Sequence, residues 1–431
     1  MALGVALVGT VVLASIPNRG APADNTIATL DTSVGAGVGS VITIGTDGLP
    51  LIVYLAGPTD RPRRDLKAAH CNDAACTSAT ITTLAKDVEG PVETQTGPAA
   101  EQNPPLSVAI GADGLPLIPY YKGSTADLMA IHCNDVACTS ATHARVDTAG
   151  NVGRSPSVTI APEIRTAPDA PPGATPVPAG PVISYYDATN GDLKAALCDD
   201  PACAGGNETI VTVDANGDAG RGTTVATGAD GIPIIAYLAG PAGNAQLRAA
   251  YCAPADGDDP SFCDGPAITD LGPPVQDFAA VTSIVIGSDG LPLIGRFGPF
   301  AHCDDVACLS ATFTTAGAVP DEECCPPGSA QIPIPQSLTV GVDGLPIFVG
   351  QFRAGPTSQG LAHCTDVLCS SATYALVSET NWETPSVTLG ADGLPIIAFR
   401  GGLQEEGGGV LDGLSVAHCT NEFCLPLFRR R

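Results

Sequence analysis

Short apolar runs separated by polar turns recur along the whole chain, and residues 107–147 hold one complete copy of the pattern. An Asp-Gly step between β-branched and aliphatic runs favours a tight hairpin, because glycine adopts the positive φ that the turn requires. A second polar turn joins two further apolar runs, so the copy predicts a four-stranded antiparallel meander. In chain order these runs and turns are 107–110, Asp113-Gly114, 115–121, 128–133, 134–137 and 138–146.

The first hairpin recurs at intervals of roughly 50 to 66 residues. Six copies carry Asp-Gly followed by Leu-Pro or Ile-Pro. A seventh, degenerate copy keeps the flanking strands at 157–161 and 181–186, but a proline-rich insertion at 162–180 replaces its turn. The six turns begin at Asp47, Asp113, Asp230, Asp289, Asp343 and Asp392.

The second hairpin recurs seven times with a cysteine on each side of its turn. The pairs are Cys71/Cys76, Cys133/Cys138, Cys198/Cys203, Cys252/Cys263, Cys303/Cys308, Cys364/Cys369 and Cys419/Cys424. A four-stranded meander cannot cover both of its faces alone, so seven copies predict a ring in which each sheet packs on its neighbours. The expected fold is therefore all-β: a seven-bladed β-propeller of four-stranded antiparallel blades.

Composition supports strands and a single domain. The 431 residues include 50 Gly and 39 Pro, but only 2 Met and 19 Lys and Arg, which leaves little helix-forming material. A ring of blades also accommodates a chain too long for one ordinary core. We expect residues 24–431 to form one propeller domain.

Residues 1–23 are expected to be a signal peptide or apolar leader. Met1 to Ile16 is apolar and uncharged, is short for a membrane span, and is followed by the small-x-small sequence Ala21-Pro22-Ala23. After cleavage no membrane span would remain. The alternative is a retained segment that anchors the protein, docks on a partner or mediates self-association.

Residues 25–31, NTIATLD, resemble the fourth strand of other copies, such as 79–85, ATITTLA. The last copy lacks this strand, because the chain ends seven residues after Cys424. We therefore expect the N-terminal strand to complete the last blade and close the ring, which removes an exposed sheet edge.

The even cysteine inventory indicates an oxidising location, secreted or at the cell surface, with the periplasm as an alternative. Six pairs are separated by four residues across a turn, near the spacing that a disulfide requires. Cys324 and Cys325 are adjacent in an irregular connector, and either a vicinal disulfide or a covalent link to a second chain would account for them. Unpaired buried thiols and zinc binding by the HCxDxxC motif are the weaker interpretations of the pairs.

The sequence predicts neither a metal site nor a cofactor. In five copies a histidine precedes the first cysteine, but adjacent strand residues point to opposite faces, so each histidine points away from its own cysteine pair. Each Asp-Gly turn offers one carboxylate, which suits turn formation and lacks the ladder of oxygens that calcium prefers.

In such a meander the first-to-second and third-to-fourth turns lie on one face of the ring, here called the turn face. The other connections lie on the opposite, variable-loop face and differ from copy to copy. Variable loops on a rigid scaffold are where binding sites usually accumulate. The candidate binding residues are Arg61, Arg63, Arg64, Trp382, Glu405 and Glu406.

Catalytic chemistry is sparse in the sequence. There is no phosphate loop, nucleophile elbow or metal-ligand motif, and the innermost strands that would line a central channel carry Ser, Val, Thr and Ile without acids. The net charge of −26 disfavours nucleic acid and anionic membranes. We expect a non-enzymatic module that binds an extracellular protein or glycan, or a structural surface component. The alternative is a glycan hydrolase or lyase with its site at the central channel.

The repeats resemble those of secreted bacterial seven-bladed propeller proteins with GxDGLPxISYYD and HCxDxxC signatures. The resemblance covers residues 25–431 and is clearest at 184–198, SYYDATNGDLKAALC. It implies the propeller fold and export, and it implies no particular activity.

Overall fold

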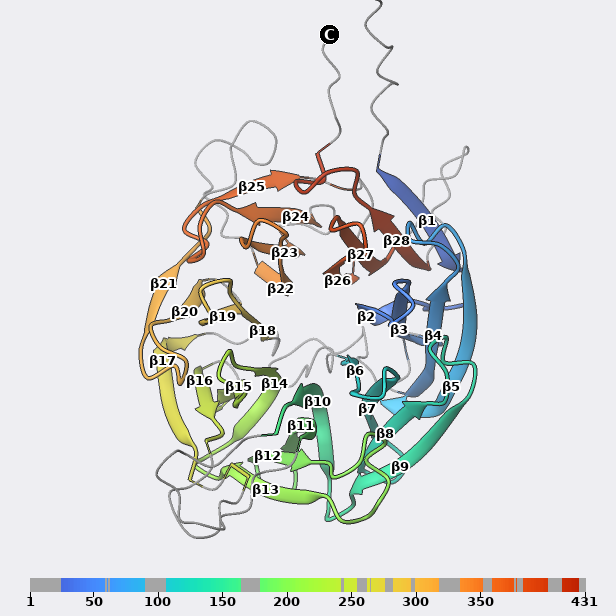
Figure 1. Ribbon diagram of the computed structural model, residues 1–431. Helices are drawn as coiled ribbons and strands as arrows, with labels where there is room; N and C mark the ends of the chain where they lie inside the picture. Colours follow the sequence, from blue (N-terminus) through green and yellow to red (C-terminus); the bar gives the residue numbers. More distant parts are fainter. Residues whose placement is uncertain are drawn as a thin grey trace, which may run out of the picture.

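The computed structural model describes residues 25–58, 60, 63–89, 106–163, 179–241, 244–253, 262–263, 265–275, 282–295, 299–317, 334–351, 359–375, 377, 383–401 and 413–425. Within these ranges every regular element is a β-strand. The strands fall into four-stranded antiparallel groups, called blades below, arranged around a common centre (Figure 1).

Three blades cover the first half of the chain. Strands β2–β9 form one sheet, but a single residue pair, Val88 with Lys122, joins β5 to β7, so this sheet divides into two blades. The first blade holds β2 (Val38–Ile44), β3 (Pro50–Ala56), β4 (Arg63–Cys71) and β5 (Ala79–Glu89). The next holds β6 (Ala109–Ile110), β7 (Pro116–Lys122), β8 (Asp127–Cys133) and β9 (Ala141–Asp147). The third holds β10 (Val152–Ala161), β11 (Gly180–Asp187), β12 (Asp192–Leu197) and β13 (Thr209–Asp214).

The second half of the chain repeats the same plan. One blade holds β14 (Ala219–Thr227), β15 (Pro233–Ala239), β16 (Ala245–Tyr251) and β17 (Ala267–Val275). The following blade holds β18 (Ser283–Ile286), β19 (Pro292–Gly295), β20 (Phe300–Cys303) and β21 (Ala311–Thr314). The next holds β22 (Ile334–Val340), β23 (Pro346–Gln351), β24 (Gln359–Cys364) and β25 (Ala372–Ala375). The last holds β26 (Glu383–Leu389), β27 (Pro395–Arg400), β28 (Leu414–His418) and, at its outer edge, β1 (Thr26–Asp31).

The last blade closes the ring with the N-terminal strand. Strand β1 pairs antiparallel with β28, from Thr26 opposite His418 to Asp31 opposite Leu414. The side chain of Asn25 extends this pairing, because its Nδ2 donates to the carbonyl of Cys424 over 2.9 Å. The predictions of an all-β propeller and of an N-terminal closing strand are therefore confirmed.

Each blade buries its apolar faces against its neighbours. Where the first blade meets the last, Ile52 and Tyr54 of β3 share one buried cluster with Ile396 of β27 and Val416 of β28. Similar clusters lie between other consecutive blades, so the core is a ring of interfaces between sheets. This arrangement places the first strand of each blade at the centre and the fourth strand at the rim (Figure 1).

The seven predicted cysteine pairs are disulfides, each at the end of the third strand of a blade, with Cα atoms 4.2 to 4.9 Å apart. All fourteen cysteines are buried, with at most 1% of each residue exposed. Disulfides at this density indicate an oxidising compartment. The bridges are Cys71–Cys76, Cys133–Cys138, Cys198–Cys203, Cys252–Cys263, Cys303–Cys308, Cys364–Cys369 and Cys419–Cys424.

The second cysteine of each bridge corrects one detail of the sequence interpretation. We expected it to begin the fourth strand of its blade, as in the run 138–146, but β9 begins at Ala141 and Cys138 lies in the turn. Cys138 has a left-handed φ of 54°, and its N–H donates to the carbonyl of Asp135 over 3.0 Å. This backbone conformation belongs to a turn and not to an extended strand. Each bridge therefore ties the end of a third strand to the following turn. The cysteines with this conformation, at φ of 50° to 55°, are Cys76, Cys138, Cys203, Cys263, Cys308, Cys369 and Cys424.

Two other predictions fall on parts of the chain that the structure does not describe. Cys324 and Cys325 lie outside the described residues, as do Met1 to Ile16. No helix of the described part is long and apolar enough to cross a membrane.

Candidate functional site

The innermost strands enclose a central channel with a volume of about 360 Å³. Its described lining contains Ser, Thr, Gly, Gln, Pro and aliphatic residues, and none of them is charged. Cleavage of a glycosidic bond generally uses two carboxyl groups that flank it. The described part of the channel wall does not supply them, so the channel itself is a poor candidate for chemistry.

The hydroxyl groups of the channel wall join neighbouring blades. Ser107 Oγ accepts a hydrogen bond from the backbone N–H of Val158 over 3.0 Å, and Ser157 Oγ accepts one from Val225 over 3.2 Å. Ser337 and Ser386 do the same for Val387 and Ile42, each over 3.2 Å. These four hydroxyls therefore satisfy backbone donors between blades, which is a structural role.

The turn face carries a repeated pair of side chains. At the first-to-second turn of the second blade, Asp113 Oδ1 accepts from the backbone N–H of Leu115 over 3.1 Å, and Gly114 has a φ of 82°. The other oxygen, Oδ2, lies 2.8 Å from Nε2 of His132 at the end of β8. One carboxylate thus closes its own turn and fixes the histidine of the neighbouring hairpin.

The same aspartate–histidine pair occurs in five blades. The distance from Nε2 to Oδ2 is 2.8 or 2.9 Å in four of them and 3.3 Å between His363 and Asp343. A tyrosine replaces the histidine in the fourth blade, where the hydroxyl of Tyr251 donates to Asp230 over 2.6 Å. The pairs are His70–Asp47, His132–Asp113, His302–Asp289, His363–Asp343 and His418–Asp392.

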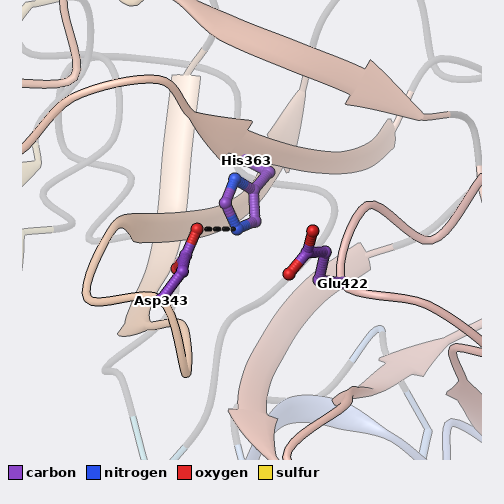
Figure 2. Close-up of side chains that lie close together, drawn as sticks. All are labelled: Asp343, His363 and Glu422. Carbon is purple, nitrogen blue, oxygen red and sulfur yellow. Dashed lines mark ion pairs between the residues drawn. The ribbon is translucent and has the colours of Figure 1, made fainter.

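One of these pairs has a third member. Glu422, in the turn that follows β28 of the last blade, faces His363 from the side opposite Asp343 (Figure 2). One nitrogen or oxygen atom from each of the three side chains lies within 4.8 Å of the others. It is the one group of three or more His, Cys, Asp or Glu side chains, among the described residues, that is close enough to hold a metal ion. We call these three residues the Glu422 cluster.

Burial differs across the Glu422 cluster. The His363 side chain is 2% exposed and that of Asp343 is 32% exposed, while Glu422 is half-buried. The ring of Phe423 packs on the imidazole with a centroid distance of 4.8 Å. The Nδ1 atom of His363 lies 3.1 Å from the carbonyl oxygen of Cys364, so Nδ1 donates and carries a proton. In the neutral ring, Nε2 therefore presents a lone pair to the two carboxylates.

The structure places two of the six predicted binding residues. Arg63 is exposed and binds Asp87 over 3.3 Å, while Arg64 is 2% exposed and lies inside the protein. Arg61, Trp382, Glu405 and Glu406 lie outside the described residues. A binding role for this set remains a prediction.

The Glu422 cluster was missed in the sequence, although a signal was present. The residue three positions after the first cysteine is Ala74, Val136, Pro201, Val306 or Val367 in five of the other copies, and only in the last copy is it an acid. We had regarded the repeat histidines as unrelated to metal binding on the basis of their own cysteines. We also judged neighbouring blades to lie too far apart for their histidines to share an ion, but that reasoning did not consider a carboxylate in a turn of the next blade.

No protein-family model and no curated protein matches the chain. Solved structures do share its architecture. A protein of unknown function from Dyadobacter fermentans is 9% identical with a TM-score of 0.48, over 92% of this chain and 97% of that one. An α-L-arabinofuranosidase of Fusarium graminearum is 12% identical with a TM-score of 0.43, over 93% and 98%. A polysaccharide lyase family 25 ulvan lyase is 11% identical with a TM-score of 0.45, over 92% and 94%.

These neighbours correct two predictions. We expected a non-enzymatic binding or structural module, and we expected that the chain is not an enzyme. The named relatives of known activity are enzymes that act on glycans, which favours our alternative over our main interpretation. At such low identity the likeness concerns the fold, and it assigns no residue of this chain to a reaction. The resemblance to secreted repeat proteins stays a prediction, since no family model supports it.

Proposed function

We propose that the protein is an exported glycan-cleaving enzyme, a glycoside hydrolase, that acts at the Glu422 cluster on its turn face. The observation that carries the proposal is the position of Glu422, which departs from the repeat and brings a second carboxylate to an existing aspartate–histidine pair. Titratable groups that converge where the fold does not require them are candidates for proton transfer or electrophilic activation.

The Glu422 cluster is accessible to a substrate and carries carboxylates that could react with it. Asp343 and Glu422 both reach solvent, so a sugar oxygen could approach the carboxylates, while the buried His363 stays fixed beneath them. The channel wall offers hydroxyl groups and no described charge, and most of its serines are engaged between blades. The reaction is therefore better assigned to the turn face than to the channel.

The overall charge favours hydrolysis over elimination. Lyases cleave polymers of uronic acids, which are polyanions, and a chain with a net charge of −26 repels them at low ionic strength. Neutral glycans carry no such penalty. We infer that the substrate is a neutral polysaccharide outside the cell or in the periplasm.

The test is a polysaccharide panel that includes neutral arabinan and acidic ulvan, followed by new reducing ends and by the ultraviolet absorbance of unsaturated uronate. Hydrolysis of a neutral member is expected, with new reducing ends and no unsaturated product. Glu422→Gln should lower kcat/KM at least about 100-fold, as loss of a reacting group does. The matched control Glu208→Gln, a half-buried acid beside a third-to-fourth turn of another blade, should retain activity.

Two outcomes would overturn the proposal. One is a folded protein that releases no reducing ends from any member of the panel. The other is turnover that Glu422→Gln leaves at the wild-type rate. Turnover of ulvan with an unsaturated product would replace the hydrolase with a lyase.

A further inference from the structure

In the Glu422 cluster, lone pairs of hydrogen-bond acceptors face one another, and a bound cation would turn this repulsion into attraction. With Nδ1 of His363 donating to the carbonyl of Cys364, the neutral ring directs the lone pair of Nε2 toward Asp343 Oδ2, 3.3 Å away. Two acceptors then face each other, and Glu422 adds a third from the opposite side (Figure 2). Within the described residues, Nε2 of this 2% exposed side chain has no hydrogen-bond partner.

The other repeat histidines show how His363 differs. None of them donates Nδ1 to a backbone carbonyl in the described structure, and three of them, His70, His132 and His302, make a hydrogen bond of 2.8 or 2.9 Å with their aspartate. His418 also lacks a hydrogen bond at Nε2 among described residues, but no second acid approaches it there. His363 alone combines an oriented ring, a long contact to its aspartate and a second carboxylate.

We propose that Asp343, His363 and Glu422 bind one divalent transition-metal cation, Zn²⁺ or Mn²⁺, between the last two blades. An ion with bonds of about 2.0 to 2.2 Å can join ligand atoms up to about 4.4 Å apart, and the three atoms lie within 4.8 Å, so a small movement of Glu422 completes the set. A histidine that donates its other N–H to a backbone carbonyl is the usual form of a metal-ligating imidazole. The imidazole ligand favours a transition metal over Ca²⁺ and Mg²⁺, which prefer sites made of oxygen ligands alone.

Three protein ligands leave coordination positions for water or a sugar oxygen. Asp343 and Glu422 are the more exposed members, so the open positions face solvent. A cation there would polarise a glycosidic oxygen or lower the pKa of a bound water. A catalytic role for the cation rests on the proposed function, whereas binding of the cation does not.

A protonated His363 between two carboxylates is the metal-free rival. The two arrangements differ in a measurable way, because only the metal site takes up a cation in a fixed ratio. Glu422 is the residue to substitute, because its side chain is half-buried in a turn outside the core and its loss should not unfold the protein.

The experiment uses the complete, tag-free protein after treatment with a chelator. Free Mn²⁺ is followed by electron paramagnetic resonance, and Zn²⁺ and Ca²⁺ are titrated by calorimetry. We expect saturable binding of one Mn²⁺ or Zn²⁺ per chain, with Ca²⁺ weaker. Glu422→Gln should weaken that binding at least about tenfold. The matched control Asp113→Asn alters an aspartate–histidine pair with no third ligand, and it should leave the affinity unchanged.

A second readout locates the ion without activity. In spectra of the protein with ¹⁵N-labelled histidines, Zn²⁺ should shift the Nε2 signal of one ring, and that ring should be absent in His363→Gln. Stoichiometric binding that Glu422→Gln does not weaken, or no saturable binding of either transition metal, would overturn the inference. Metal binding without any glycan turnover would contradict the proposed function alone, and turnover that is indifferent to the chelator would reject the catalytic part of the inference.

Discussion

Buried aspartates at the ends of outer strands hold the blades together at the level of single residues. Asp31, the last residue of β1, accepts from the hydroxyl of Tyr54 over 2.7 Å and from Lys67 Nζ over 2.9 Å. Both partners belong to the first blade, whereas β1 belongs to the last. The same aspartate, tyrosine and cation recur as Asp147, Tyr185 and Lys194 and as Asp214, Tyr237 and Arg248.

This environment changes the acidity of Asp31. Burial acts to raise its pKa, but the backbone N–H of Ser33, the Tyr54 hydroxyl and the Lys67 ammonium outweigh burial and lower the pKa from 3.8 to about 2. A pKa that is lower in the folded chain means that the unfolded chain binds more protons. The stabilisation is therefore present above about pH 4 and is lost as the pH falls through about 2.

Asp31→Asn tests this linkage. The shift corresponds to roughly 2 kcal/mol at pH 7, so the variant should unfold with a free energy lower by about that amount at pH 7, and the difference should shrink toward zero near pH 2. Urea unfolding at both pH values measures it. The control Asp60→Asn removes an exposed turn carboxylate and should give the same small difference at both. A large, pH-independent cost of Asp31→Asn would show that the carboxylate's charge is not what stabilises the contact.

Residue contacts between blades were the part that the sequence did not predict. Asp31 was placed correctly on the closing strand, but its partners Tyr54 and Lys67 lie in another repeat, 23 and 36 positions away. Glu422 likewise meets His363 across a blade boundary. A repeat alignment compares equivalent positions and contains no information on how one sheet is rotated against the next, which is what decides these contacts.

At the scale of elements, the closing strand shows what local patterning can predict. The likeness of 25–31 to a fourth strand, together with the missing strand in the last copy, was sufficient to assign β1 to the last blade. The hairpins followed from turn chemistry, since Asp-Gly marks six first-to-second turns and a cysteine pair marks the turn after each third strand. The alternation of apolar and polar residues and the turn residues decide which strands pair within a blade, because paired strands are neighbours in the sequence.

Deleting residues 1–31 should destabilise the fold strongly, because it exposes the edge of β28 and leaves Tyr54 and Lys67 without Asp31. We expect the melting temperature to fall by more than about 5 °C, as measured by circular dichroism. Deleting residues 1–23 is the matched control, because it leaves β1 complete and should not change the melting temperature. Equal melting temperatures for the two truncations would mean that β1 does not close the ring.

For the whole molecule, the disulfides are a large share of the stability. Six of them span five positions and one spans eleven, and each ties the end of a third strand to the turn that follows it. Restricting such short loops in the unfolded chain contributes about 2 kcal/mol per bridge. Seven bridges together contribute about 14 kcal/mol, which is close to the upper end of the total stability of a typical domain.

The reduced chain should therefore fail to fold. After reduction in denaturant, dilution into reducing buffer should leave the protein without its native circular dichroism, whereas dilution into an oxidising glutathione buffer should restore it. The paired replacement Cys133→Ser with Cys138→Ser tests one bridge, and it should lower the free energy of unfolding by about 2 kcal/mol without preventing folding. Because all fourteen bridged cysteines are buried, a mild reductant should release few thiols from the native protein. A reduced chain that regains the native spectrum would show that the packing between blades alone is sufficient to close the ring.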